Sequence, residues 1–256
     1  MECLSHSCGV RLIGKAAVSE VAIKVPWRLI FGLGPNIVDR SPTSVDVFTA
    51  GICKVIKPEP LISGLENLPE NPTFVLAANH YQRKGLWILF PAAILTQIIR
   101  QHYGPADPPV RWMVTANWPR IRLGRLSFPS PGDILLPRVA DALACYPVSF
   151  AGSNQEFTAR SIRRVLREAP RASRPLGIFP EGVGGSAGVL TKAIPGVGRL
   201  LTHLAKAGMP VVPVCISEAQ GRLVFRIGGV VKTREIIQSS DAAALVLACI
   251  QALLPA

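Results

Sequence analysis

One histidine lies where a sequence pattern predicts an active site. The apolar segment FVLAA (74–78) leads directly into Asn79 and His80, after which a polar turn precedes a helical stretch. Ligands gather at the carboxyl ends of strands in open α/β sheets, so His80 stands at an expected position. A neutral imidazole there could act as a general base toward a hydroxyl. A histidine at a strand end can equally be a hydrogen-bonded structural residue.

A second segment places a carboxylate before a group of glycines. In LGIFPEGVGG (176–185), an apolar strand is followed by Pro180 and Glu181, and then by a cluster that includes Gly182 and Gly184. Glycines allow backbone amides to approach a phosphate closely, which suggests a binding loop. A flexible connecting loop is the alternative interpretation.

The same glycines superficially resemble a dinucleotide fingerprint. Gly182, Gly184 and Ala187 fit the spacing G-x-G-x-x-A. Pro180 and Glu181 nevertheless separate the strand from the first glycine, and no clean helical pattern opens after it. We therefore reject the dinucleotide-fingerprint interpretation of these glycines.

A third segment, AGMPVVPVCIS (207–217), has a helix stop at Gly208 followed by a strand with Pro210 and Pro213. By itself it indicates only a strand whose prolines lie near its start or at a sheet edge.

Taken in order, the three segments resemble the glycerolipid acyltransferase family that includes lysophosphatidic-acid acyltransferase. The lead ISGLENLPENPTFVLAANH is similar to the family's first block, IFPEG to its third and MPVVPV to its fourth, so the resemblance spans roughly residues 59–217. It implies transfer of a fatty acyl group from acyl-CoA or acyl-carrier protein to the hydroxyl of a lysophospholipid, of the 1-acyl-glycerol-3-phosphate type, in phospholipid synthesis. These thioesters are co-substrates, and no cofactor or metal is implied.

One departure from the family pattern concerns catalysis. The family places an aspartate after four residues from the histidine, where a carboxylate fixes the imidazole tautomer and stabilises the imidazolium. Gly85 occupies this position. Glu181 is the first candidate for a substitute carboxylate, and Asp107 and Glu218 are weaker ones. Alternatively, His80 acts without a partner, or the protein binds lipid or acyl thioester without catalysing transfer. A nucleotide-binding enzyme ranks third behind an acyltransferase and a non-catalytic binding protein.

A second pair has the family's spacing in a different setting. His102 and Asp107 are separated by four residues, but His102 follows a predicted helix and leads into a proline-rich loop. The resemblance places the catalytic histidine after an apolar strand and Asn79, which favours His80 over this pair.

The substrate-binding residues are predicted from the same blocks. The family's usual threonine and arginine after the third-block glycine are replaced by Val183 and Gly184, and its second block is recognisable only as YPVSF (146–150). The predicted substrate-binding set is Asn79, Arg83, Lys84, Pro180, Gly182, Gly184 and Lys192, with Arg199 as a further phosphate partner.

The elements that must position these residues alternate between strand and helix. Strands are expected at 74–78, 111–115, 146–150, 176–179, 211–217 and 223–228, and helices near 85–101, 132–144, 155–169, 196–208 and 239–253. The pattern predicts an α/β fold with a mostly parallel central sheet flanked by helices. Residues 1–58 are expected to form a helical lead that lies on a membrane or packs on the domain, and residues 59–256 form the acyltransferase-like domain.

Composition limits the partners. Lys and Arg number 28 against 16 Asp and Glu, which favours anionic partners. Aromatic residues are few, at 6%, and no nucleic-acid motif occurs, which argues against nucleic acid. An arginine-rich helix at 155–169 could face anionic lipid, coenzyme phosphates or only solvent. The oligomeric state is not predicted.

Cysteine spacing and hydropathy suggest a location. The six cysteines show no paired spacing, which indicates free thiols in a reducing compartment. No secretory signal is recognised, and no segment reaches the roughly 18 apolar residues of a spanning helix. We therefore expect peripheral association with the cytoplasmic face of a membrane.

Overall fold

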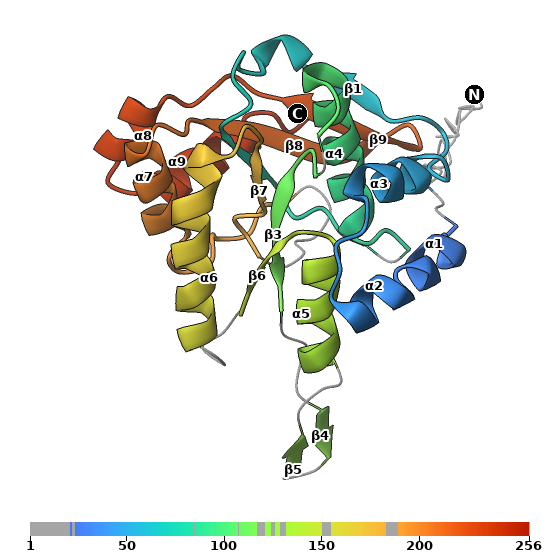
Figure 1. The fold of residues 1–256 in the computed structure, drawn as a ribbon. Helices are drawn as coiled ribbons and strands as arrows, with labels where there is room; N and C mark the ends of the chain where they lie inside the picture. The colour runs from blue at the N-terminus through green and yellow to red at the C-terminus, as the bar shows by residue number, and fades with distance from the viewer. Residues whose placement is uncertain are drawn as a thin grey trace, which may run out of the picture.

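The computed structural model describes residues 21, 24–83, 85–106, 108–116, 121–123, 126–128, 132–149, 155–182 and 189–255. Within this part, seven strands form one sheet in the order β1-β9-β8-β2-β7-β3-β6 (Figure 1). The strands are β1 (Leu61–Ser63), β2 (Val75–Ala78), β3 (Arg111–Thr115), β6 (Tyr146–Val148), β7 (Leu176–Ile178), β8 (Val211–Ala219) and β9 (Arg222–Ile227). β9 runs antiparallel to β8, and the other neighbouring pairs are parallel. The predicted mostly parallel sheet is therefore confirmed.

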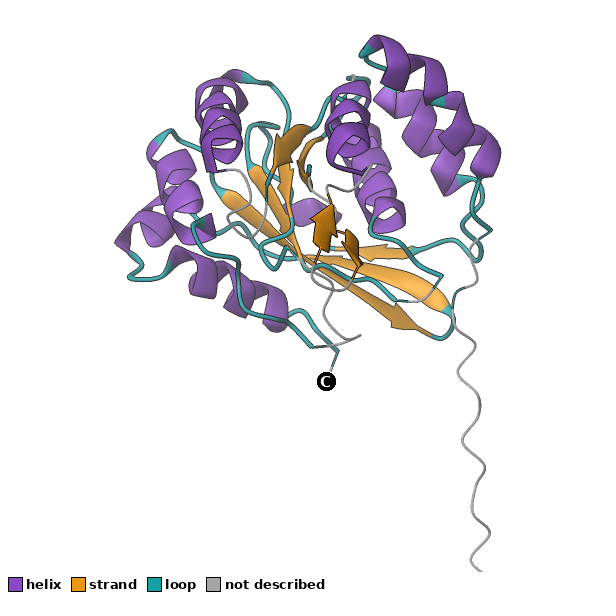
Figure 2. Ribbon diagram, turned by 90° about the horizontal axis from the view of Figure 1, so that it is seen from below, coloured by secondary structure: helices purple, strands orange, loops and turns teal. Residues whose placement is uncertain are grey.

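Helices cover both faces of the sheet (Figure 2). One face carries α3 (Val45–Cys53), α4 (Leu89–Tyr103) and α5 (Gly132–Ala142), and the other carries α6 (Gln155–Glu168), α7 (Val197–Lys206), α8 (Thr233–Gln238) and α9 (Ala242–Gln251). The sequence of β2 is continuously apolar because both faces of this strand are buried. Val75 and Ala77 belong to the core on the α7 side, whereas Leu76 and Ala78 belong to the core on the α4 side.

The sequence missed some short elements. β1 extends the sheet beside β9, and a separate antiparallel pair joins β4 (Ile121–Leu123) to β5 (Leu126–Phe128). Two single-turn 3₁₀ helices at Leu65–Asn67 and Ala169–Arg171 and the short α8 were also not expected. Segments of three to six residues carry too few positions to show a clear hydrophobic period.

The described part of the N-terminal lead, residue 21 and residues 24–58, contains three helices. α1 (Trp27–Gly32) and α2 (Gly34–Asp39) are short, whereas α3 packs along α4 and contributes Phe48 and Ile52 to the main core. α2 lies beside α5 (Figure 1). Among the described residues, no helix is long and apolar enough to cross a membrane.

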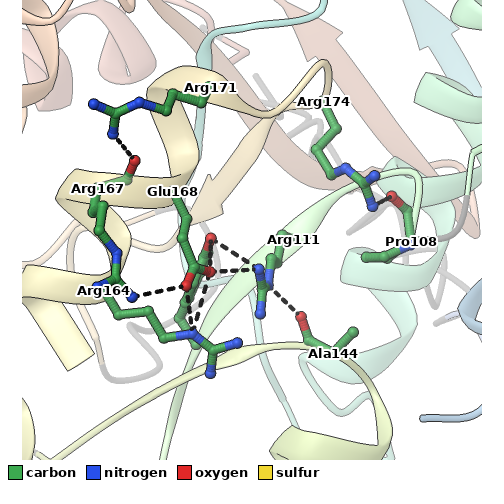
Figure 3. A network of polar contacts seen from close by, with 9 residues as sticks. Pro108, Arg111, Ala144, Arg164, Arg167, Glu168, Arg171 and Arg174 are labelled. Carbon is green, nitrogen blue, oxygen red and sulfur yellow. Dashed lines mark hydrogen bonds and ion pairs between the residues drawn. The ribbon is translucent and has the colours of Figure 1, made fainter. Parts of the chain in front are cut away.

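A charged network ties β3 to α6 (Figure 3). The Arg111 guanidinium donates to Oε2 of Glu168 at 2.9 Å and to the carbonyl of Ala144 at 2.8 Å. Arg164 donates to both Glu168 oxygens, and Arg167 contacts the same carboxylate. Arg111 opens β3 and Glu168 closes α6, so the network lies at the amino ends of the parallel strands. Part of the arginine-rich face is therefore structural.

We predict that Glu168→Gln lowers the free energy of unfolding by about 1–2 kcal/mol, because Arg111 and Arg164 lose their shared carboxylate. Partial burial would raise the pKa of Glu168, but the hydrogen bond and charge of Arg164 and the charge of Arg111 outweigh it and lower the pKa. The contribution of Glu168 to the free energy of unfolding is thus fully present above the ordinary glutamate pKa. It is lost as the pH falls through the lowered pKa of the folded state. Denaturant unfolding at several pH values measures it.

Glu156→Gln is the matched control on the same helix. The Glu156 side chain is 82% exposed and lies 4.0 Å from Arg160, so its loss should change stability by less than about 0.5 kcal/mol. Equal effects of the two variants would contradict the structural role of Glu168.

Candidate active site

The pairing of two strands brings His80 and Glu181 together. β2 and β7 are parallel neighbours in which Ala77 is paired with Ile178. Three residues beyond each partner lie His80 and Glu181, so the register predicts that they are adjacent. The backbone N–H of His80 indeed donates to Oε1 of Glu181 at 2.8 Å.

Asn79 holds the end of β2 to the strand on its other side. Its side-chain N–H donates to the carbonyl of Ile216 at 2.9 Å, and its side-chain oxygen accepts from the Ile216 N–H at 2.6 Å. The side chain is thus bonded like one more residue of the sheet ladder, and Asn79 is only 5% exposed. The structure gives Asn79 a role in positioning His80, and its predicted contact with substrate stays a prediction.

Gly85 lies in a tight turn between His80 and α4. The backbone N–H groups of Arg83 and Leu86 donate to each other's carbonyls, and Gly85 has a φ of +80°. Such a conformation suits glycine and is costly for most other residues. A Cβ at Gly85 would meet nothing within 4 Å. The backbone conformation, rather than lack of space, therefore favours glycine at the position where the sequence resemblance implies an aspartate.

Arg83 and Glu218 form an ion pair near this turn. Nε of Arg83 lies 2.8 Å from Oε1 of Glu218 and a terminal nitrogen lies 3.0 Å from Oε2, with both side chains less than one-fifth exposed. Arg83 also donates to the carbonyl of Val21. The contacts of Glu218 are thus with Arg83 and the Val21 N–H, and none joins it to the His80 ring.

The His80 ring lines an apolar cavity of about 460 Å³ between the sheet and helices α1–α5. The ring contacts Phe179 edge-on at 5.4 Å, and Phe179 stacks on Trp112 at 4.9 Å. The Trp112 N–H donates to the Thr96 hydroxyl, and both residues line the cavity. A cavity of this size and lining suits a largely apolar ligand.

Burial favours the uncharged form of the His80 imidazole. Desolvation lowers its pKa, and this effect outweighs the raising effects of a backbone hydrogen bond and of the Glu181 charge. Nδ1 is buried and has no hydrogen-bond partner among the described residues. A neutral imidazole at the wall of an apolar cavity can accept a proton from a bound hydroxyl.

The other predicted residues are dispersed. Gly182 lines the same cavity, while the carbonyl of Pro180 accepts from the Ile194 N–H. Lys192 and Arg199 line a second cavity, of about 750 Å³, beside α7 and the start of α9 on the opposite face of the sheet. Lys84, Gly184 and Asp107 lie outside the described residues.

His102 is distant in the fold from the His80 site. It lies in the last turn of α4, exposed, with its ring against Tyr103. Since α4 leads back to the start of β3, this end of the helix is at the amino ends of the strands. The structure thus separates His102 from the carboxyl ends where His80 lies.

Thr191 was not anticipated from sequence. Its backbone N–H and its hydroxyl donate to Oε2 of Glu181, at 2.5 and 2.9 Å. A threonine ten residues after a glutamate gives no local signal, since the contact exists only in the folded chain. The aromatic pair Phe179 and Trp112 was likewise recognised only as strand residues.

Comparisons with known proteins identify the family of the chain and a similar fold. A protein-family model described as Acyltransferase matches residues 60–217. The crystal structure of the 1-acyl-sn-glycerophosphate (LPA) acyltransferase PlsC from Thermotoga maritima is similar in fold, with a TM-score of 0.51 and 15% sequence identity over 81% of this chain and 76% of that chain. No curated protein matches the sequence.

We predict that the His80 imidazole titrates below the value of about 6.5 that is usual for an exposed histidine, because burial disfavours the charged ring. Proton–nitrogen correlation spectra of the full chain between pH 4 and 8 measure the titration. The spectrum of His80→Ala assigns the resonance. A His80 midpoint above 6.5 would contradict the buried, neutral imidazole.

Proposed function

Because the chain belongs to the acyltransferase family, we propose that it transfers a fatty acyl group from acyl-CoA or acyl-carrier protein to the hydroxyl of a lysophospholipid, of the 1-acyl-glycerol-3-phosphate type, in phospholipid synthesis. The observation that carries this proposal is the position of His80, a buried imidazole in the wall of an apolar cavity at the carboxyl ends of the strands. The cavity suits an acyl chain, and the imidazole suits activation of a hydroxyl.

The proposed reaction needs one proton carrier. His80 takes the proton from the acceptor hydroxyl as its oxygen attacks the thioester carbonyl carbon. The carbon–sulfur bond then breaks, and the imidazolium returns the proton to the departing thiolate, so that an ester and a thiol are formed. A thioester is an activated acyl donor, which lessens the help that the leaving group requires.

Exposed aromatic residues next to the cavity support peripheral membrane association. On α1, Trp27 is 52% exposed and Phe31 is 73% exposed, and their rings stack at 5.8 Å. Trp27 also contacts Trp87, which lines the cavity. The exposed Lys24 and Arg28 add positive charge beside this aromatic patch, as expected for a surface that meets anionic lipid. Lipid substrates would then reach the cavity from the bilayer at the cytoplasmic face.

The alternative is a protein that binds lipid or acyl thioester without turnover. Gly85 and the unpartnered Nδ1 of His80 favour it, since disabling the carboxylate of a serine-protease triad costs about 10⁴ in rate. The buried carboxylate of Glu181 beside His80 favours the enzyme.

We predict that the purified protein acylates a lysophospholipid and that His80→Ala lowers kcat by roughly 10²–10⁴-fold, the usual contribution of a general base. Acyl-CoA and acyl-carrier protein are assayed against a panel of lysophospholipids, with thiol release and lipid product both measured. His102→Ala is the control and should retain activity. Full activity of His80→Ala would refute the role of His80, and binding without turnover across the panel would establish the alternative.

We predict that Trp27→Ser combined with Phe31→Ser lowers partitioning onto phosphatidylglycerol-containing vesicles by roughly tenfold or more, because two large apolar side chains leave the contact surface. Vesicle co-sedimentation measures the change. Ile237→Ser, an exposed apolar position on α8, is the matched control and should bind like the wild type. Unchanged partitioning of the double variant would show that α1 does not meet the membrane.

A further inference from the structure

The carboxylate of Glu181 is buried and bonded entirely by uncharged groups. Glu181 is 1% exposed, and Oε1 accepts from the His80 backbone N–H at 2.8 Å. Oε2 accepts from the backbone N–H and the hydroxyl of Thr191, at 2.5 and 2.9 Å. Among the described residues, no Lys, Arg or His forms an ion pair with it. These three donors hold the carboxylate in one orientation without neutralising its charge.

The His80 ring, unlike the His80 backbone, makes no described hydrogen bond with Glu181. Its Nδ1 is buried without a hydrogen-bond partner among the described residues, and one side of the ring faces Phe179. The contact between His80 and Glu181 therefore runs through the backbone, and the carboxylate acts on the ring only through space. Such an interaction is strengthened by the low polarity of the site.

Two other titratable groups near the cavity are balanced or neutral. On β8, Glu218 is paired with Arg83. Before β6, burial raises the pKa of the Cys145 thiol to about 12, so that the thiol stays uncharged at neutral pH. The described cavity residues on α4 and β3 include no further ionisable side chain. Glu181 thus places next to His80 a carboxylate that no described Lys, Arg or His side chain pairs with.

We propose that Glu181, held by Thr191, is the positioning residue that replaces the absent motif carboxylate: it fixes His80 through the backbone and supplies a fixed negative charge that stabilises the imidazolium. A carboxylate at position 85 would hold the imidazole by a direct hydrogen bond. Glu181 instead stabilises the charged ring without touching it. This role rests on the acyl transfer proposed above. Glu181 stabilises the imidazolium during the interval in which His80 carries the proton, after the acceptor hydroxyl gives it up and before the departing thiolate takes it.

The direct test measures the His80 imidazole titration in Glu181→Gln. Removing a nearby negative charge disfavours the imidazolium, so the titration midpoint should fall, by roughly 0.5–1 pH unit. Glu168→Gln removes a carboxylate at the opposite ends of the strands and should leave the His80 midpoint unchanged. This readout needs no turnover, so it tests the role of Glu181 even if no acyl acceptor is found.

Kinetics of the same variant give a second readout. In Glu181→Gln, kcat should fall about 10-fold or more, and the acid limb of the pH–kcat/KM profile should move to lower pH together with the NMR midpoint. A purely structural glutamate would instead lower the thermal unfolding midpoint and leave the His80 titration in place. An unchanged titration in a folded Glu181→Gln protein overturns the proposal.

Thr191 provides a milder variant that does not remove the charge. Thr191→Val loses the hydroxyl donor while keeping the backbone N–H, and should lower kcat about three- to tenfold with KM for the acyl donor unchanged, as expected for one lost hydrogen bond. Thr191→Ser restores the hydroxyl and should lie within about twofold of the wild type. Equal kcat values for the valine variant, the serine variant and the wild type would overturn the role of Thr191.

Discussion

The site depends on the parallel pairing of β2 with β7. Because Ala77 lies opposite Ile178, the chains that leave these strands emerge side by side, and His80 meets Glu181. On the other side of β2, the Asn79 side chain makes two hydrogen bonds with the Ile216 backbone and so ties the end of β2 to β8. His80, the proposed general base, is therefore held from both sides by the sheet. Its place follows from strand register, which a one-residue shift would destroy.

The surroundings of His80 combine two opposing electrostatic effects. Burial against Phe179 and the apolar cavity disfavours the charged ring, whereas the Glu181 carboxylate favours it. The net effect lowers the pKa of His80 and so favours the neutral imidazole, the form that can accept a proton. For a general base of this kind, the apolar wall keeps the ring uncharged before reaction, and the carboxylate stabilises the positive charge that develops on the ring during reaction. Both come from the segment at the end of β7, where Phe179 and Glu181 are two residues apart.

The helices on the cavity face connect the site with the outside. α3 packs on α4 to close the cavity, while α1 presents Trp27 and Phe31 to solvent and joins them to the cavity residue Trp87. The opposite face has a structural character: Arg111 and Glu168 bind α6 to the sheet at the far ends of the strands (Figure 3). The apolar cavity that contains His80 and the Arg111–Glu168 network thus lie on different faces of the sheet.

The sequence alone determined the strands and long helices, the position of His80 after β2 and of Glu181 after β7, and the absence of a carboxylate at Gly85. Those features depend on local hydrophobic period and on short motifs. Only the tertiary structure decided which partners these residues have: Arg83 is joined to Glu218, Glu181 bonds the His80 backbone rather than its ring, and Thr191 completes the contact. Long-range hydrogen bonds depend on strand order and loop course, which no local pattern encodes. For the same reason the positive φ of Gly85, which explains why glycine suits that position, appears only in the folded chain.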